Sequence, residues 1–277
     1  MDNKIIVTHN AGFYSNCSIR LKHIVDFYNK NKIYPIVDSS SQWIYYKDNP
    51  DVDITNIFFK DNNTEFKELD HISYDEEKED QFSQYNELDY DNINILIEKY
   101  FKPSDEIIFI TNTLIKNYNI DINKTIAVCY RGNDKHKETN VPSYNDMLVK
   151  ITEIKNKYPD YKLLIQSDEA EFYNFILGKY PDSIYFNEIL KMGQNHNTAI
   201  QYHIPIGNRV NQAKIFHSIL LIISKCDKVI LNSGNVGMWI CLNRGNFNGV
   251  YQYLNHKEYI YNEYNRNYKK LENNWIE

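Results

Sequence analysis

Hydrophobic and polar positions alternate in blocks along this chain, and the blocks predict strands and helices in turn. Short apolar runs, typical of buried parallel strands, occur at residues 4–8, 33–37, 126–129, 161–165, 183–186, 228–231 and 250–253. Segments that interleave apolar and polar residues at the helical period occur at residues 17–29, 103–115, 143–158, 170–180, 210–224 and 236–242. Strands that alternate with helices in this way predict an α/β fold with doubly wound parallel sheets.

The pattern divides the chain near residues 119–123, and we expect two domains, 1–120 and 121–277. Residues 48–92 are weakly patterned and contain the acidic run 75–80. Such a run is typical of a solvated face or an insert.

Composition excludes several classes of protein. The net charge of −6 argues against a general nucleic-acid binder, whose surface would be basic. Since no apolar run reaches the ~18 residues of a membrane span, we expect none. Residues 1–4 do not begin a signal peptide, and the four cysteines are scattered without metal-binding spacing. These features favour a cytoplasmic protein.

Three predicted strands of the second half end in polar loops. Four charged residues, Arg131, Asp134, Lys135 and Glu138, follow the strand at 126–129 within eight positions. The other two loops are residues 167–169 and 232–235. Because the carboxyl ends of parallel strands share one edge of a sheet, we expect these loops to converge on one ligand.

The residue types in these loops suit a phosphate-containing ligand. An arginine can bind phosphate with two hydrogen bonds, a lysine adds charge, and a carboxylate can take a proton. The turn at Ser233, Gly234 and Asn235 either offers backbone N–H groups to a phosphate or is an ordinary helix cap. Neither GxGxxG nor GxxxxGK[ST] occurs in the places those motifs require, which argues against a dinucleotide dehydrogenase and a P-loop enzyme.

The sequence Cys129-Tyr-Arg-Gly-Asn-Asp-Lys135 resembles the HxRxxDK motif of the α1,6- and O-fucosyltransferase-like superfamily, which includes the rhizobial nodulation fucosyltransferases. Other short segments resemble that superfamily in the same order. The loop 10–16 is similar to its Gly-Phe-Gly-Asn loop, residues 166–169 to its T/S-D-D loop, and residues 224–236 to its S-K-C-D…S-S-N segment.

The resemblance implies a GT-B architecture, in which two Rossmann-like domains face each other across a cleft. It implies an inverting, metal-independent glycosyltransferase that moves fucose from GDP-fucose to a glycan or another hydroxyl acceptor. Two alternatives remain open at this stage: a non-catalytic nucleotide-sugar-binding or glycan-binding relative, and a GT-B transferase that uses another nucleotide sugar. No cofactor is expected beyond the donor substrate.

The resemblance also implies roles for single residues. Arg131 would bind the β-phosphate, Lys135 would add charge or position the acceptor, and Asp134 would orient one of them. Glu138 would be the catalytic base, with Asp168 as its rival. The expected nucleotide-sugar-binding residues are Asn10, Gly12, Ser167, Asp168, His217, Ser233, Gly234 and Asn235.

The chain departs from the family pattern at a few positions. Cys129 stands where the family has a histidine, and Gly132 where the α1,6 enzymes have a second arginine. A carboxylate that many relatives place on the long helix is absent, and His217 near that place is either a ligand contact or a structural histidine. Two DxD triplets, at 51–53 and 89–91, lie in an acidic stretch where chance explains them better than a metal site.

Overall fold

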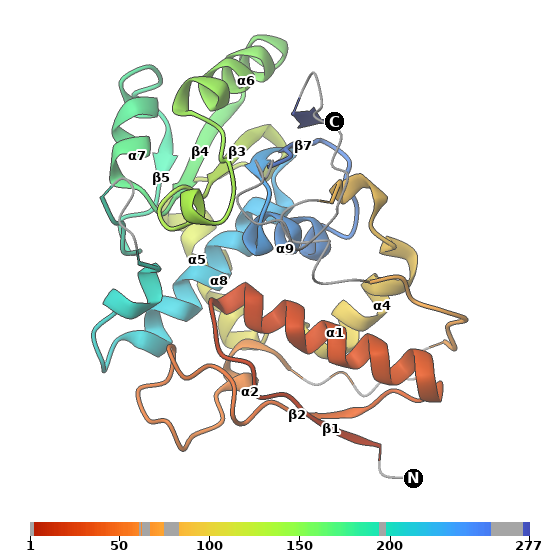
Figure 1. Ribbon diagram of the computed structural model, residues 1–277. Coiled ribbons are helices and arrows are strands. Elements are labelled where there is room, and N and C mark those ends of the chain that lie inside the picture. The colour runs from red at the N-terminus through yellow and green to blue at the C-terminus, as the bar shows by residue number, and fades with distance from the viewer. Residues whose placement is uncertain (1–2, 61, 63–66, 75–82, 194–197, 256–273) are drawn as a thin grey trace.

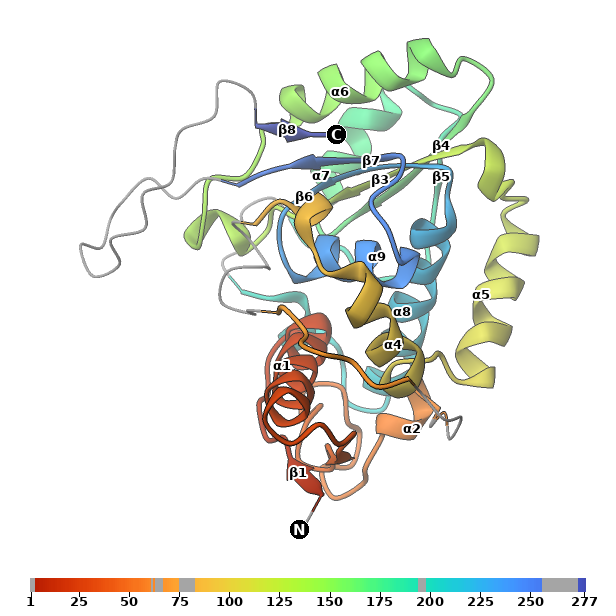
Figure 2. The ribbon, with the colours of Figure 1, turned by 90° about the vertical axis from the view of Figure 1, so that its right-hand side faces the viewer.

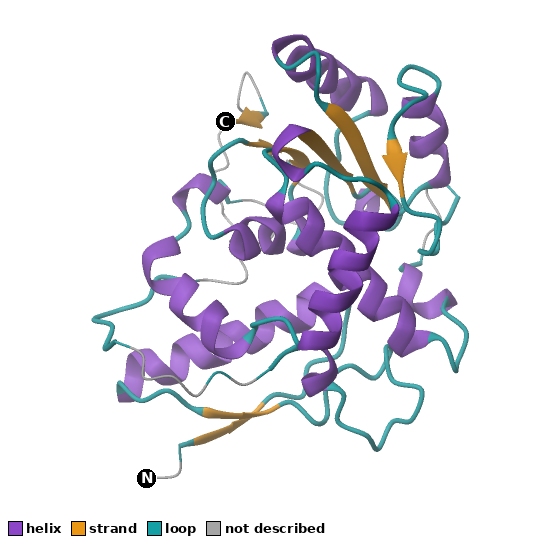
Figure 3. Ribbon diagram, turned by 180° about the vertical axis from the view of Figure 1, so that it is seen from behind, coloured by secondary structure: helices purple, strands orange, loops and turns teal. Residues whose placement is uncertain are grey.

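In the computed structural model, residues 3–60, 62, 67–74, 83–193, 198–255 and 274–277 are described (Figure 1). They form a six-stranded sheet, a separate pair of parallel strands, and helices that lie between and around them. Figures 1 and 3 show the two sheets at opposite ends of the molecule, with α1 (Phe13–Asn31), α8 (Arg209–Lys225) and α9 (Asn235–Arg244) in the space between them.

The larger sheet is built from the second half of the chain and has the strand order β5-β4-β3-β6-β7-β8. Its strands are β3 (Thr125–Tyr130), β4 (Lys162–Ser167), β5 (Ile184–Tyr185), β6 (Lys228–Asn232), β7 (Val250–Tyr253) and β8 (Trp275–Ile276). All neighbours are parallel except β8, which pairs antiparallel with β7. The central strand β3 is buried along its whole length, as its uninterrupted apolar run predicts.

Alternate residues of β3 point to two different helical layers. Ile126 and Val128 belong to the apolar cluster that includes α6 (Tyr144–Lys157) and α7 (Ala170–Leu177). Ala127 and Cys129 belong to the cluster that includes α8 and α9. Figure 2 shows α6 on one side of the sheet and α8 and α9 on the other. The second half therefore has the doubly wound arrangement that its alternating pattern predicts.

The first half holds much less sheet. Strands β1 (Lys4–Ile6) and β2 (Ile36–Asp38) pair in parallel, with α1 as the connection between them. The remaining elements of this half are helical: α2 (Thr55–Phe58), the 3₁₀ turn η1 (Tyr85–Glu87), α4 (Tyr90–Tyr100) and α5 (Asp105–Asn117). Among the described residues, the expected first Rossmann-like sheet is thus reduced to two strands.

The two halves share one hydrophobic core. The Tyr14 ring of α1 stacks on the Trp239 ring of α9, with centroids 5.7 Å apart. The Phe13 ring packs edge-on against Phe58 of α2, at 4.9 Å, and against Phe216 of α8, at 6.5 Å. A division into two domains at residue 120, and a GT-B cleft between them, stay predictions.

Several element boundaries differ from the sequence pattern. Helix α1 begins four residues earlier than expected, and β2 begins at Ile36 because Pro35 lies inside the expected strand. Helix α4 and strand β8 were not expected at all. The acidic run 75–80 lies outside the described residues. Within the described part of the chain, no helix is both long and apolar enough to cross a membrane.

Candidate active site

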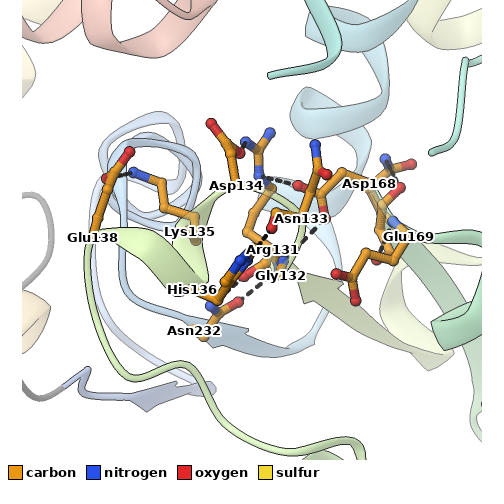
Figure 4. Close-up of polar contacts among 12 residues, drawn as sticks. Arg131, Gly132, Asn133, Asp134, Lys135, His136, Glu138, Asp168, Glu169 and Asn232 are labelled. Atoms are coloured by element: carbon orange, nitrogen blue, oxygen red, sulfur yellow. Dashed lines mark hydrogen bonds and ion pairs between the residues drawn. The ribbon is translucent and has the colours of Figure 1, made fainter. Parts of the chain in front are cut away.

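The carboxyl ends of β3 and β6 are joined by two hydrogen bonds between a side chain and the backbone. The Arg131 backbone N–H, just past β3, donates to Asn232 Oδ1 at 2.9 Å, and Asn232 Nδ2 donates to the Arg131 carbonyl at 2.9 Å. The amide of Asn232, the last residue of β6, therefore fixes the point at which the chain leaves β3 (Figure 4). The loop that begins there carries the charged residues that the sequence singled out.

Two carboxylates hold the Arg131 guanidinium. Its Nε lies 3.0 Å from Asp168 Oδ2, and its Nη2 lies 3.7 Å from Asp134 Oδ1. Asp168 is buried and also accepts a hydrogen bond from the Gly132 N–H at 3.1 Å. Burial raises the pKa of Asp168, although the guanidinium opposes that shift. Burial favours a lower pKa for Arg131, but Asp168 and Asp134 outweigh it and raise that pKa, so Arg131 stays a cation.

A cavity of about 580 Å³ opens beside this arginine. Its volume lies within the range of small-molecule sites. The cavity brings together eight of the predicted site residues: Asn10, Gly12, Arg131, Asp134, Lys135, Glu138, Gly234 and Asn235. Segments from both halves of the chain therefore meet around one space.

The other predicted residues lie outside this cavity. Ser167 and Asp168 line a narrow neighbouring space of about 50 Å³, on which Arg131 also borders. Asp168, the rival for the base, thus lies behind the arginine rather than on the main cavity. Ser233 is buried, and its N–H and hydroxyl both donate to the Tyr253 carbonyl.

Lys135 and Glu138 form an ion pair on the wall of the cavity. Lys135 opens the 3₁₀ turn η3 (Lys135–Lys137), and its Nζ lies 2.6 Å from Glu138 Oε2 (Figure 4). The Lys135 side chain also passes within 3.8 Å of the Cβ position at Gly234, the residue that precedes α9. The ammonium group therefore lies between the candidate base and the start of α9.

Two helices begin at the cavity, and neither has a side-chain cap. Gly234 precedes α9 with φ +136°, a conformation that favours glycine, and Gly12 precedes α1. The first turn of α1 contains no acidic residue. The Tyr46 hydroxyl accepts from the Phe13 N–H, the first of α1, at 2.6 Å. The first turn of a helix has further backbone N–H groups without intrahelical partners, and the helix dipole favours an anion there. Together with Arg131 and Lys135, these helix starts make the cavity suited to a phosphate-containing ligand.

Two predicted contact residues are already bonded within the protein. Asn10 Oδ1 accepts from the Ile44 N–H at 2.9 Å, and its Nδ2 donates to the Thr8 and Ser41 carbonyls. The Asn235 side-chain oxygen accepts from the Ser18 hydroxyl of α1. Both residues line the cavity, but their amides hold neighbouring segments in place.

His217 lies inside the core rather than on the cavity. Its Nδ1 is 2.8 Å from the Tyr14 hydroxyl, and its ring packs against Phe13 and Phe59, both with centroids at 5.3 Å. Burial lowers its pKa to about 3, so the imidazole is neutral. This geometry agrees with the second of the two alternatives left open by the sequence, in which His217 is a structural histidine.

The structure gives a physical reason for one of the two departures from the motif that the sequence resembles. A Cβ atom at Gly132 would lie 2.6 Å from Glu169 Oε2 and 2.6 Å from Tyr130 Cε1, so an arginine does not fit there. Glu169 is fixed in that place by the Tyr144 hydroxyl, at 2.6 Å. The Cys129 thiol is buried, and burial raises its pKa to about 12, so it is neutral.

Both DxD triplets stabilise local structure. Asp53 Oδ1 accepts from the Thr55 N–H at the start of α2, at 2.9 Å. Asp89 is the N-cap of α4, where it accepts from the Asn92 N–H, and it also accepts from the Ser73 N–H. Among the described residues, no group of three or more His, Cys, Asp or Glu side chains is placed to hold a metal ion.

The cavity also includes residues that no sequence motif indicated. They are Tyr46, Lys137, Thr198, Gln201 and Tyr202, from the segments 39–60, 131–138 and 198–208. The Tyr46 hydroxyl accepts from the Phe13 N–H at 2.6 Å, which supports the start of α1. Asn133 donates to the Thr198 carbonyl at 3.0 Å and so ties the arginine loop to the third segment. Only tertiary packing brings these segments together, so no local signal marks them.

The chain matches no protein-family model and no curated protein. Among solved structures, it resembles NodZ α-1,6-fucosyltransferase co-crystallised with GDP, at a TM-score of 0.35 and 15% identity, over 50% of this chain and 40% of that one.

Two further solved structures are similar to the same extent. Fucosyltransferase NodZ from Bradyrhizobium gives a TM-score of 0.34 and 17% identity, over 49% of this chain and 40% of that one. NodZ α-1,6-fucosyltransferase soaked with GDP-fucose gives a TM-score of 0.37 and 16% identity, over 53% of this chain and 44% of that one. The chain spans less than half the length of each of these enzymes.

Proposed function

We propose that this protein is an inverting, metal-independent glycosyltransferase that transfers fucose from GDP-fucose to a hydroxyl group of a glycan or another acceptor. The observation that carries the proposal is the placement of Arg131. Its guanidinium is fixed by two carboxylates, yet it borders a cavity of about 580 Å³ that also holds Lys135, Glu138 and the starts of α1 and α9.

These groups match the charges that develop in glycosyl transfer. When the bond between the sugar anomeric carbon and the β-phosphate oxygen breaks, its electron pair stays on the diphosphate. Arg131, Lys135 and the start of α9 would stabilise that negative charge without a metal ion. Because the two carboxylates already orient the guanidinium, little reorganisation is needed during the reaction.

Glu138 would take the proton from the acceptor hydroxyl as its oxygen attacks the anomeric carbon from the opposite face. Its carboxylate is half-exposed and lines the cavity, whereas Asp168 is buried behind Arg131. In this mechanism, Lys135 holds Glu138 in place before the acceptor arrives and afterwards neutralises the diphosphate.

The variant Glu138→Gln tests the assignment of the base. It should reduce transfer from GDP-fucose at least about a hundredfold, because general-base catalysis contributes roughly 10²–10⁴-fold. Its dissociation constant for GDP should stay within about twofold of the wild-type value. Glu87→Gln, at a residue that does not line the cavity, is the matched control. Unchanged turnover in Glu138→Gln would remove Glu138 from this role.

Specific observations favour each of the two alternatives. The close Lys135–Glu138 pair is compatible with a non-catalytic nucleotide-sugar-binding relative, in which the carboxylate only positions the lysine. The observation behind a transferase that uses another nucleotide sugar is Cys129, which stands where the motif has a histidine. Retained GDP-fucose binding without turnover would support the first alternative, and turnover with another donor would support the second.

A further inference from the structure

An exposed aromatic ring stands at the cavity, and the proposed chemistry does not use it. Tyr202 belongs to the turn η4 (Ile200–His203) and lines the cavity with 54% of its surface exposed. A tyrosine ring is a large apolar surface, and it is more often half-buried or buried than left open to water. Its exposure beside a polar cavity therefore requires an explanation.

A second tyrosine holds the Tyr202 ring in place. The rings of Tyr45 and Tyr202 pack edge to face, with centroids 4.9 Å apart and planes at 83°. In an edge-to-face pair one ring presents its edge, so at least one face of each ring stays uncovered by its partner. Tyr202 thus offers a flat surface whose orientation is set.

The two segments that carry these tyrosines are fastened to each other and to the site. Ile44, next to Tyr45, is hydrogen-bonded to Asn10 of the cavity wall. Asp48 Oδ1 accepts from the Gly207 N–H at 2.8 Å and from the Arg209 N–H at 3.2 Å, at the start of α8. The aromatic pair is therefore part of the cavity's frame.

Tyr202 also lies close to the charged loop of the site. A hydrogen bond with Tyr45, followed by smaller effects that include the Asp134 carboxylate, raises the pKa of Tyr202. Glu138 and Lys135 lie on the wall of the same cavity. A molecule resting on the ring would therefore be near the candidate base.

We propose that Tyr202, braced by Tyr45, is a stacking platform for a pyranose ring of the acceptor, which makes the acceptor a carbohydrate. This inference rests on the proposed function. A pyranose has an apolar face of C–H groups, which packs on an aromatic ring, and a rim of hydroxyl groups. Gln201 lines the same cavity beside Tyr202, and its amide can hydrogen-bond to that rim.

The test is saturation-transfer difference NMR with simple sugars on the full chain in the presence of GDP. The probes are the methyl glycosides of glucose, galactose, mannose and N-acetylglucosamine. Sorbitol serves as a compound with similar hydroxyl groups but no ring face. At least one methyl glycoside should give a signal well above sorbitol, strongest on the C–H protons of one ring face.

Variants assign that signal to the platform. Tyr202→Leu should weaken binding of the responding glycoside about tenfold, whereas Tyr202→Phe should stay within about twofold, because the aromatic face is what binds. Phe109→Ala, which removes an exposed aromatic ring of α5 outside the cavity, should change nothing. Equal binding in Tyr202→Leu, or no glycoside signal above that of sorbitol, would overturn the inference.

A parallel measurement separates this inference from the proposed function. GDP binding is followed by calorimetry in the wild type, in Tyr202→Leu and in Arg131→Ala. If Tyr202→Leu loses GDP affinity as much as glycoside binding, the ring stacks on the nucleotide base, and the acceptor platform is wrong. If the wild type itself does not bind GDP but the glycoside signal still depends on Tyr202, the nucleotide part of the proposed function fails and the platform stands.

Discussion

Arg131 is held by a pair of carboxylates in a partly buried place, and this arrangement has consequences for stability as well as for chemistry. Its partner Asp168 is almost completely buried, with 2% of its side chain exposed. A buried ion pair contributes little net stability, but the loss of one partner leaves an uncompensated charge. Removal of one member alone is therefore expected to destabilise the fold around the strand exits.

The variant Arg131→Met is expected to lower the free energy of unfolding by about 3–5 kcal/mol, because Asp168 is left unpaired. Adding Asp168→Asn removes the stranded charge, so the double variant should recover most of the loss. Urea denaturation followed by circular dichroism measures both values. A double variant that is no more stable than Arg131→Met would show that the pair is not energetically coupled.

A second prediction at the scale of one residue concerns Gly132. Gly132→Ala should destabilise the protein by about 1–3 kcal/mol, because the added methyl group would overlap the Glu169 carboxylate and the Tyr130 ring. Gly12→Ala is the matched control, since its Cβ position has no neighbour within 4 Å and its φ is −57°. Similar unfolding midpoints for the two variants would argue against a close contact at Gly132.

At the scale of elements, α1 and α8 are joined by a buried polar contact inside an aromatic cluster. The Tyr14 hydroxyl of α1 meets the His217 ring of α8, and both side chains are buried. The His217 imidazole is neutral there, because burial lowers its pKa from 6.5 to about 3. Protonation of this ring would place a charge in the core that both helices share.

This contact predicts the pH dependence of stability. Below about pH 6.5 the unfolded chain binds a proton at His217 that the folded protein does not bind, so stability should fall as the pH drops toward 3. The slope from this group is at most about 1.4 kcal/mol per pH unit. His217→Gln, which keeps a hydrogen-bonding partner for Tyr14, should remove that part of the slope in denaturation series at pH 7.5, 6 and 5. An unchanged slope would contradict the assignment.

Local sequence signals predicted most elements of the second half and the charged loop after β3. Its strands are apolar runs and its helices are periodic, so both signals come from neighbouring residues. Helix α4 was missed although it has a local signal: Ile93, Leu96 and Tyr100 are buried at helical spacing, and Asp89 caps its start. Tyr46 and Tyr202 have no such signal, because only tertiary structure brings them to Arg131.

At the scale of the whole molecule, the candidate site lies where segments of both halves meet. The first half supplies the start of α1 and Tyr46, and the second supplies the arginine loop and the start of α9. Because one hydrophobic core runs through both halves, these walls are positioned by the same packing. From the strand exits, the sequence predicted that three loops of the second half converge, and residues from two of these loops line the cavity, whereas Ser167 and Asp168 line the small space beside it. It did not predict that the first half would contain only a two-stranded sheet in its described part.

The central claim, that Arg131 and its cavity bind the diphosphate of GDP-fucose, is tested most directly by calorimetry and thermal unfolding with GDP, UDP and ADP, each with and without EDTA. GDP at 100 times its dissociation constant should stabilise the protein by ~2.7 kcal/mol, with no effect of EDTA. That stabilisation should disappear in Arg131→Ala, measured against the variant's own unfolding midpoint. Equal stabilisation of Arg131→Ala by GDP, or no response to any of the three nucleotides, would contradict the claim.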